Sequence, residues 1–460
     1  MAGVTSPAPT SAALAQRPLI AGLLVLVTAV AFEAQSVSTA MPAAAADLGQ
    51  LDLYAWAFTA FAIPQIVAIV AGGRLCDRFG PVRPLQLGVL IFAAGVLLSA
   101  LAVSMPMLLA GRFVQGLGGG LTNLALMVVV GRAFPPADTS RLMTYFSFAW
   151  MLPSFVGPGV AAWLVHVWSW HAVFWAVLPV VGLGVALLGP ALAHRPLPGL
   201  GAAPAGTRTL LAGLGLAVGA AVVQAAAQLG SLWGIPLGVA GALLLVVGIP
   251  RLMPRGWRPL GVGLAGVIAS RFFFSGAFSV TFGFLPLMIV KLRGQELFVG
   301  GIALTVASFG WTFGSWVQSQ RWLHLSRDRI TTLGTALVTV GLSIVASGSF
   351  VLEVPVAVVI AGATIAGAGM GLAMPSTSIL MIQLSPTDEL GHNTSALQVA
   401  EALGNAVIVG AAGALFGAFS GAGDLRNAFG WAAALAAACA AASVAFSRRC
   451  GHVENLSARP

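Results

Sequence analysis

Long apolar runs separated by short polar stretches make up almost the whole chain. A helix that crosses a bilayer needs about 20 mostly apolar residues, and fourteen runs are long enough to meet that requirement. Their predicted limits are 19–41, 54–73, 84–105, 107–132, 142–164, 171–193, 209–229, 233–250, 260–290, 298–319, 330–350, 354–382, 393–418 and 428–446. The pattern therefore predicts an all-α integral membrane protein with fourteen transmembrane helices.

The seventh and eighth runs, 209–229 and 233–250, are rich in Ala and Gly and lie only a few residues apart. One interpretation is a single broken apolar linker between two halves of the protein. We favour two helices, because about 40 apolar residues would be an unusual linker in water. An even number of spans also places both ends of the chain on one side of the membrane.

Composition and charge agree with this interpretation. Hydrophobic residues make up 58% of the chain and charged residues 8%, whereas a soluble domain carries about 25% charge. With the N-terminus in the cytoplasm, seventeen of the 22 lysines and arginines fall in cytoplasmic segments, three fall outside and two lie within spans. This asymmetry predicts a multi-pass protein of the cell inner (plasma) membrane with both termini cytoplasmic. The net charge of +9 thus reflects topology and contact with anionic lipid, and nucleic-acid binding is not expected.

The three cysteines, Cys76, Cys439 and Cys450, fall at or near the cytoplasmic side in this topology. They predict neither a disulfide nor a metal site, because cytoplasmic thiols are kept reduced and the spacing matches no metal motif. No cofactor is expected, and no stretch is polar enough to form a separate soluble domain.

A short charged segment, GRLCDRFGPVR at residues 73–83, joins the second and third runs. Gly73 and Gly80 would let the backbone turn at both ends of this loop. The segment resembles the signature loop of the major facilitator superfamily, although Pro81 and Val82 stand where that family usually has basic residues. The resemblance implies a gating role for Asp77 and Arg78, with Asp77 capping a helix that begins near residues 391–395.

The chain also carries an internal repeat. Residues 110–121 coincide with residues 361–372, including four glycines, and the same offset places Asp77 and Arg78 on Asp328 and Arg329. The repeat predicts a duplicated six-helix unit with a two-helix insert, and such repeats place a binding site near the midplane at their interface. Together with the resemblance of the signature loop, this implies the major-facilitator fold with two six-helix bundles. The predicted domains are an N-terminal bundle at 1–195, a two-helix insert with linkers at 196–258 and a C-terminal bundle at 259–460.

Four ionisable residues, Glu33, Arg112, Arg271 and Glu401, fall inside the predicted spans. A charge at the bilayer centre costs about 2.5–3.5 kcal/mol, so these residues are either functional or paired. Glu33 lies roughly 21 Å along its span at 1.5 Å per residue, and a buried carboxyl there is suited to load and release a proton. Its surroundings, EAQSVSTAMP, resemble the first-span motif of the fourteen-span drug:proton antiporters, with Glu in place of the usual Asp.

The segment that begins at Arg112 resembles the R-x-x-Q-G element of the same superfamily, with Gln115 as its glutamine. That resemblance implies that Arg112 and Gln115 support proton transfer or tie the fourth span to the first. A guanidinium that is always charged needs an acceptor, and Glu33 or first-span carbonyls are the candidates; an arginine reaching outward to the interface is the alternative. Glu401 is a second possible proton or cation site, or a carboxyl facing cytoplasmic water. Arg271 is its possible counter-ion or a contact for an anionic substrate.

Gly157 and Pro158 lie inside the fifth run and resemble the antiporter motif of drug exporters, which implies efflux and a gating role. Aromatic side chains on the probable cavity helices could stack on amphipathic or cationic compounds, although most aromatic residues in such helices pack or face lipid. The predicted substrate-binding residues are Gln35, Trp56, Phe61, Gln115, Arg271, Phe284 and Trp311.

These observations predict a monomeric, proton-coupled secondary transporter that exports amphipathic small molecules or drugs by alternating access. An importer or facilitator of a metabolite in the same superfamily is the alternative. An enzyme is not expected, because the sequence has no H-E-x-x-H motif, no pair of intramembrane aspartates and no serine–histidine arrangement.

Overall fold

The computed structural model describes residues 11–133, 136–193, 207–228, 234–254, 256–320, 322–386 and 390–453. Within these ranges the chain is helical throughout, with one short 3-10 helix at Leu51–Leu53. The α-helices are α1 (Ser11–Leu48), α2 (Trp56–Phe79), α3 (Val82–Ala100), α4 (Met105–Ala133), α5 (Pro136–Val167), α6 (His171–Ala193), α7 (Thr207–Gln228), α8 (Gly234–Leu252), α9 (Leu264–Lys291), α10 (Leu297–Gln318), α11 (Arg327–Phe350), α12 (Val356–Leu384), α13 (Leu390–Ser420) and α14 (Leu425–Ser447). The predicted all-α fold and the count of fourteen helices are confirmed.

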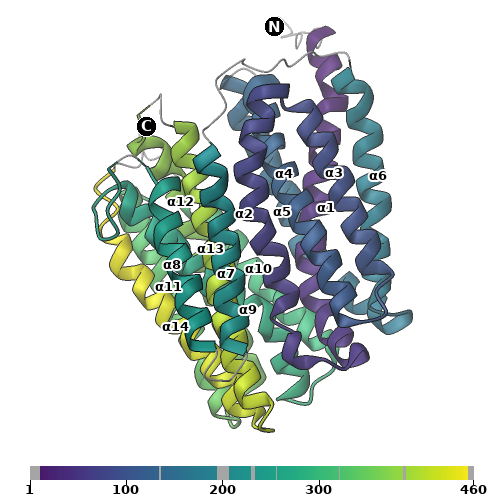
Figure 1. Cartoon of the computed structure of the whole chain (residues 1–460), viewed down its shortest axis with the longest axis vertical. Coiled ribbons are helices and arrows are strands. Elements are labelled where there is room, and N and C mark those ends of the chain that lie inside the picture. Colours follow the sequence, from purple (N-terminus) through teal and green to yellow (C-terminus); the bar gives the residue numbers. More distant parts are fainter. Residues whose placement is uncertain are drawn as a thin grey trace, which may run out of the picture.

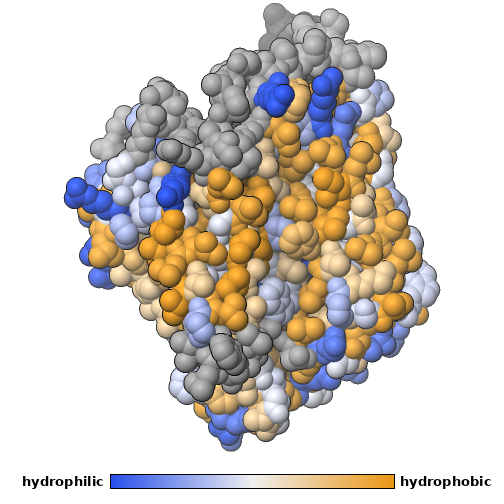
Figure 2. Space-filling view, viewed as in Figure 1, coloured by the Kyte–Doolittle hydropathy of each residue, from blue (hydrophilic) through white to orange (hydrophobic). Residues whose placement is uncertain are grey.

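Twelve of the helices in the described ranges are long and apolar enough to cross a membrane. The other two, α7 and α8, have shorter apolar stretches at Leu211–Ala226 and Pro236–Leu252 and pack against each other as a hairpin. Their outer faces carry exposed apolar side chains such as Leu211, Val239 and Val246. Figure 2 shows these faces within an apolar band that runs across the molecule, with polar residues toward its two ends. Such a band matches the hydrocarbon layer of a bilayer.

Helix α1 begins and α14 ends at the same end of the bundle (Figure 1). We call this end the termini side and the other end the opposite side. Each helix runs from one side to the other, so α1, α5, α9 and α13 run from the termini side to the opposite side, whereas α2, α4, α10 and α12 run back.

The internal repeat is visible in the helix packing. Gly116 of α4 lies so close to α2 that a Cβ would come within 2.1 Å of the Phe61 carbonyl oxygen, and its counterpart Gly367 of α12 lies as close to Ala307 of α10. Gly118 and its counterpart Gly369 make equally close approaches to α3 and α11. Small residues allow this close packing of helices in lipid. The repeated glycines therefore hold equivalent helices together in the two halves.

The charged segment at 73–83 corrects one prediction. No turn occurs at Gly73, because a helical glycine costs only about 1 kcal/mol relative to alanine and no proline interrupts the chain before Pro81. Helix α2 instead continues to Phe79, and the turn is made at Gly80, whose φ of 76° favours glycine. Asp77 thus lies in the last turn of α2, whereas Asp328 lies in the first turn of α11. These two aspartates, which the repeat aligns in sequence, therefore do not occupy equivalent positions in the two halves.

Candidate functional site

The first polar centre joins α1 to α4. Arg112 Nη1 donates to Glu33 Oε1, and the two side chains are 5% and 1% exposed. Both charges are therefore out of water, so each requires the other. The structure brings together the two residues that the sequence singled out, and Glu33 is the acceptor of Arg112.

Arg112 is also held by two neighbours within hydrogen-bonding distance. Its Nε donates to the Ala57 carbonyl of α2 at 2.9 Å, and its Nη1 donates to Gln115 Oε1 at 2.7 Å. The carbonyl acceptor belongs to the second helix, not to the first helix as predicted. The guanidinium lies over the ring of Phe61, with 4.7 Å from Cζ to the ring centroid. Three helices thus meet at one guanidinium group.

Among the residues that the structure describes, two buried atoms at this centre find no hydrogen-bond partner: Glu33 Oε2 and Gln115 Nε2. A buried polar atom left without a partner costs about 1–3 kcal/mol. One oxygen of Glu33 is therefore tied to Arg112 while the other is available for a proton. This is the chemical capacity that a proton-carrying site requires.

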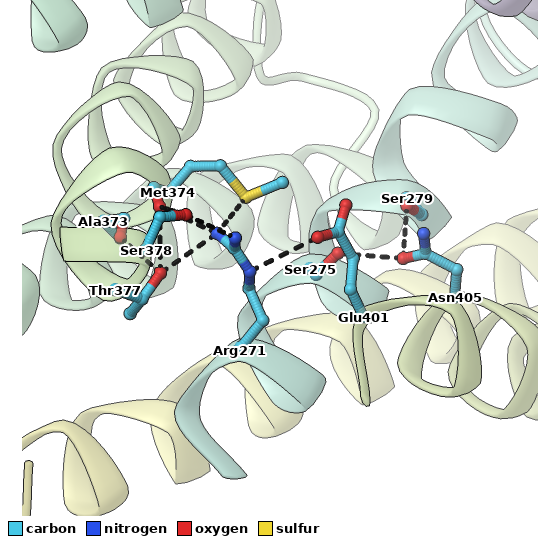
Figure 3. A network of polar contacts seen from close by, with 9 residues as sticks. All are labelled: Arg271, Ser275, Ser279, Ala373, Met374, Thr377, Ser378, Glu401 and Asn405. Carbon is cyan, nitrogen blue, oxygen red and sulfur yellow. Dashed lines mark hydrogen bonds and ion pairs between the residues drawn. The ribbon is translucent and has the colours of Figure 1, made fainter. Parts of the chain in front are cut away.

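The second polar centre joins α9, α12 and α13 (Figure 3). Arg271 Nε lies 3.3 Å from Glu401 Oε2, so Glu401 is its counter-ion. The rest of the guanidinium is bound by α12, with Nη1 donating to the Met374 carbonyl at 2.8 Å and Nη2 donating to Ser378 Oγ at 2.9 Å. Arg271 is occupied by protein groups in this conformation, whereas the Glu401 side chain is 27% exposed.

Glu401 lines a small cavity between the two halves. The lining residues are Gln65 and Ile69 of α2, Asn123 of α4, and Gln398, Glu401, Ala402 and Asn405 of α13. Asn405 Oδ1 accepts hydrogen bonds from Ser275 and Ser279 of α9, both at 3.0 Å (Figure 3). We call this cavity the polar pocket. Apart from Glu401, its polar residues were missed by the sequence analysis, although amide side chains inside apolar runs were the signal that could have found them.

The two halves touch directly toward the opposite side. Tyr54, just before α2, donates through Oη to the Gly283 carbonyl of α9 at 2.5 Å, and its ring packs edge-on against Phe284 with 5.3 Å between centroids. On another face, Phe155 of α5 stacks on Phe309 of α10 at 4.3 Å, and Gly301 packs against Pro158. The side chains of Tyr54 and Phe284 are buried. The interface between the halves is therefore closed toward the opposite side.

The remaining predicted substrate-binding residues do not gather in the polar pocket. Phe284 belongs to the closed interface, Trp311 packs edge-on against Phe278 at 5.5 Å, and Trp56 packs against the apolar cluster that α2 shares with α7 and α13. Phe61 lies under Arg112, and Gln35 lies beside Gly157 on α5. None of these aromatic side chains is among the residues that line the polar pocket.

The structure describes the surroundings of some of the predicted gating residues. Gly157 accepts a hydrogen bond from Ser36 Oγ at 3.3 Å, which ties the proline-containing helix α5 to α1 next to Glu33. Arg78 is exposed, and its Cζ lies 5.0 Å from the ring of Phe79. The Asp77 side chain and residues 387–389 lie outside what the structure describes, so the predicted helix cap stays a prediction.

The family model described as Major Facilitator Superfamily matches residues 23–408. The chain is 25% identical over 422 residues to Multidrug transporter protein MdtP of Bacillus subtilis (strain 168), an alignment that covers 88% of this chain and 76% of that protein. It is 29% identical over 167 residues to Multidrug resistance protein 3 of the same organism, covering 36% of this chain and 33% of that protein.

Two solved structures show the same fold. The in meso crystal structure of the POT family transporter PepTSo superposes with a TM-score of 0.69 at 14% identity, covering 96% of this chain and 98% of that chain. The crystal structure of a D-xylose-proton symporter gives a TM-score of 0.65 at 14% identity, covering 94% of this chain and 96% of that chain. At such low identity the similarity concerns the fold alone.

Proposed function

The chain belongs to the Major Facilitator Superfamily, and from this premise we propose that it exports amphipathic, drug-like small molecules in exchange for protons. The names of MdtP and Multidrug resistance protein 3 support the substrate class. The proposal of proton exchange rests on the site itself. The proposal also includes the predicted division into an N-terminal bundle that ends at residue 195, an insert that ends at residue 258, and a C-terminal bundle.

The observation that carries the proposal is the buried pair of Glu33 and Arg112, in which Glu33 Oε2 has no partner. When Glu33 binds a proton, its ionic attraction to Arg112 is lost, and only hydrogen bonds to neutral acceptors, the Ala57 carbonyl and Gln115 among them, hold the guanidinium. The contact between α1 and α4 then depends on the protonation of one carboxyl. Because α1 also contacts α5 and α9, a change there reaches both halves.

The polar pocket is the proposed site for the polar or cationic group of the substrate. Glu401 provides a partly exposed carboxylate, and Gln65, Asn123 and Asn405 provide amide groups from both halves. Arg271 is hydrogen-bonded to α12 and paired with Glu401, so its guanidinium is already occupied by protein groups in this conformation. The arrangement favours a cationic or neutral substrate over an anionic one.

We assign the termini side to the cytoplasm, because cytoplasmic loops of membrane proteins carry an excess of Lys and Arg. On this proposal the protein is a monomer in the plasma membrane, and the contacts of Tyr54 with Gly283 and of Gly301 with Pro158 close the interface between the halves toward the outside. Alternating access would open these contacts as the two bundles rock against each other.

Transport into inside-out membrane vesicles tests the direction and the coupling together. An exporter accumulates an amphipathic cation in vesicles that are acid inside, and a protonophore abolishes the accumulation. An importer or facilitator of a metabolite would show no accumulation driven by this gradient. Vesicles that contain Arg112→Met protein are the matched control for leak.

A further inference from the structure

The hairpin α7–α8 lies over the line where the two bundles meet. Helix α7 contacts α2 of the first half and α13 of the second half, and α2 and α13 also contact each other. Figure 1 shows α7 running along these helices in front of the bundle. The inserted helices are therefore not appended to one half but cover a seam between two parts that must move.

The covered seam lies next to the polar pocket. Gln65 and Ile69 of α2 line the pocket, while Ile66 and Ile69 of α2 belong to the apolar cluster with Leu216 and Ala220 of α7. The same turns of α2 thus face the pocket on one side and α7 on the other. Without α7, the lipid of the bilayer would reach this seam.

The hairpin is anchored to the second half. Leu252 and Met253, at the end of α8, are 5% exposed and belong to an apolar cluster with Ile268 of α9 and Met381 of α12. Farther along the hairpin, the buried Gln224 of α7 packs closely against α13, where a Cβ on Gly410 would come within 3.0 Å of Gln224 Oε1. Both the end and the middle of the hairpin thus pack against the C-terminal bundle.

The contact with the first half is also apolar. It consists of aliphatic residues of α2, such as Ile63, Ile66 and Val70, against small residues of α7, such as Gly213 and Ala217. Such contacts act by dispersion, and small sliding of packed helices against each other is an ordinary element of domain motion.

We propose that the hairpin α7–α8 is a lateral seal that is carried by the C-terminal bundle and slides along α2 during transport. The proposal rests on the proposed alternating access of the two bundles. By keeping lipid out of the seam beside the polar pocket, the seal leaves water as the route by which a substrate reaches Glu401.

A disulfide across the sliding contact tests the proposal. A Cβ built on Gly213 lies 3.2 Å from Val70 Cβ, close to the separation of about 3.5–4.5 Å found in disulfides. The variant V70C/G213C is made in a background without the three native cysteines. We expect oxidation to lower the transport rate by at least about tenfold and reductant to restore it, because the cross-link joins the hairpin to α2.

The control cross-link lies within the hairpin. A Cβ on Gly219 lies 3.1 Å from Leu244 Cβ, so oxidation of G219C/L244C should leave transport within about twofold of the reduced protein. Unchanged transport by oxidised V70C/G213C would overturn the proposal, and so would equal loss in both variants. Failure of Val70 and Gly213 to cross-link would contradict the contact itself.

A second readout separates this proposal from the proposed function. Spin labels at Val103 and Leu352, which are 83% and 44% exposed in loops on the opposite side, report whether the two bundles separate. If the reduced protein transports no tested compound, the proposed function fails. The seal is still tested, because the cross-link across α2 and α7 should freeze the distribution of distances and the control cross-link should not.

Discussion

Tyr54 makes a hydrogen bond that holds the two halves together, and Tyr54→Phe is therefore expected to shift the protein toward the outward-open state. The lost bond joins Tyr54 Oη to the Gly283 carbonyl at 2.5 Å. The ring contacts with Phe58 and Phe284, at 5.5 Å and 5.3 Å, are retained by phenylalanine. The change thus removes one hydrogen bond at nearly constant shape.

The size of the shift follows from that bond. A buried hydrogen bond contributes about 0.5–1.5 kcal/mol net, and because Gly283 lies inside helix α9 its carbonyl also has a helical partner to accept from. A loss of about 1 kcal/mol changes an equilibrium roughly fivefold. The ratio of outward-open to closed molecules should therefore rise roughly fivefold.

The assay measures distances between spin labels at Val103 and Leu352 by pulsed electron resonance in Tyr54→Phe and the parent protein. The matched control is Thr59→Val, because the buried Thr59 hydroxyl donates to the carbonyl of its near neighbour Ala55, just before α2, at 3.2 Å. We expect the population with long distances between the labels to be larger in Tyr54→Phe than in the parent protein, and to be unchanged in the control. An unchanged distribution in Tyr54→Phe would refute the idea that this contact closes the outer side.

Three further predictions concern other parts of the molecule. Glu401→Gln should weaken the binding of cationic compounds roughly tenfold to a hundredfold, since a hydrogen bond to a charged group contributes about 1.5–3 kcal/mol. The binding of neutral compounds should be unaffected. Equal loss of affinity for both classes in equilibrium binding would count against the polar pocket as the cation site. Burial and the nearby Asp328 carboxylate raise the pKa of the Cys450 thiol to about 12, so less thiolate is present at pH 8 than for a free cysteine, and mass spectrometry should find Cys450 unmodified by maleimide in native membranes but modified after unfolding. In a cysteine-free background, Arg258→Cys should resist an impermeant thiol reagent in intact cells while Glu353→Cys, exposed on the opposite side, should react; the reverse pattern would invert the assigned topology.

The helices and the two ion pairs could be predicted from the sequence because strong physical constraints act on them. Apolar runs of bilayer length have few alternatives to a helix, and the cost of an isolated charge in lipid requires partners for Glu33, Arg112, Arg271 and Glu401. The structure confirms the helix count and pairs each arginine with one of the two glutamates. The roles of these residues in transport stay predictions.

The details that depend on how each helix is rotated could not be predicted. The polar pocket gathers Gln65, Asn123 and Asn405 from three helices, and their convergence is set by tertiary packing against glycine-bearing faces. The aromatic residues chosen for substrate binding gave no such information, because phenylalanine and tryptophan serve equally in packing and in contact with lipid. The end of α2 was misplaced for a related reason, since a helix in the protein extends beyond the apolar run that predicts it.

The most direct test of proton exchange at Glu33 is the release of protons from the purified protein when substrate binds. Glu33→Gln keeps an oxygen that can accept from Arg112 but cannot exchange a proton, so it preserves the shape of the pair. Breaking a buried ion pair costs about 3–5 kcal/mol, and Glu33→Gln lessens this cost relative to Glu33→Leu because the amide oxygen still accepts from Arg112. Release is measured with a pH indicator in weakly buffered detergent solution, and thermal unfolding confirms that the variant is folded.

We expect the parent to release about one proton for each substrate bound, in keeping with a single exchanging carboxyl, and folded Glu33→Gln protein to release none while still binding substrate. Equal release from the parent and Glu33→Gln would contradict the central claim and would transfer the coupling site to Glu401.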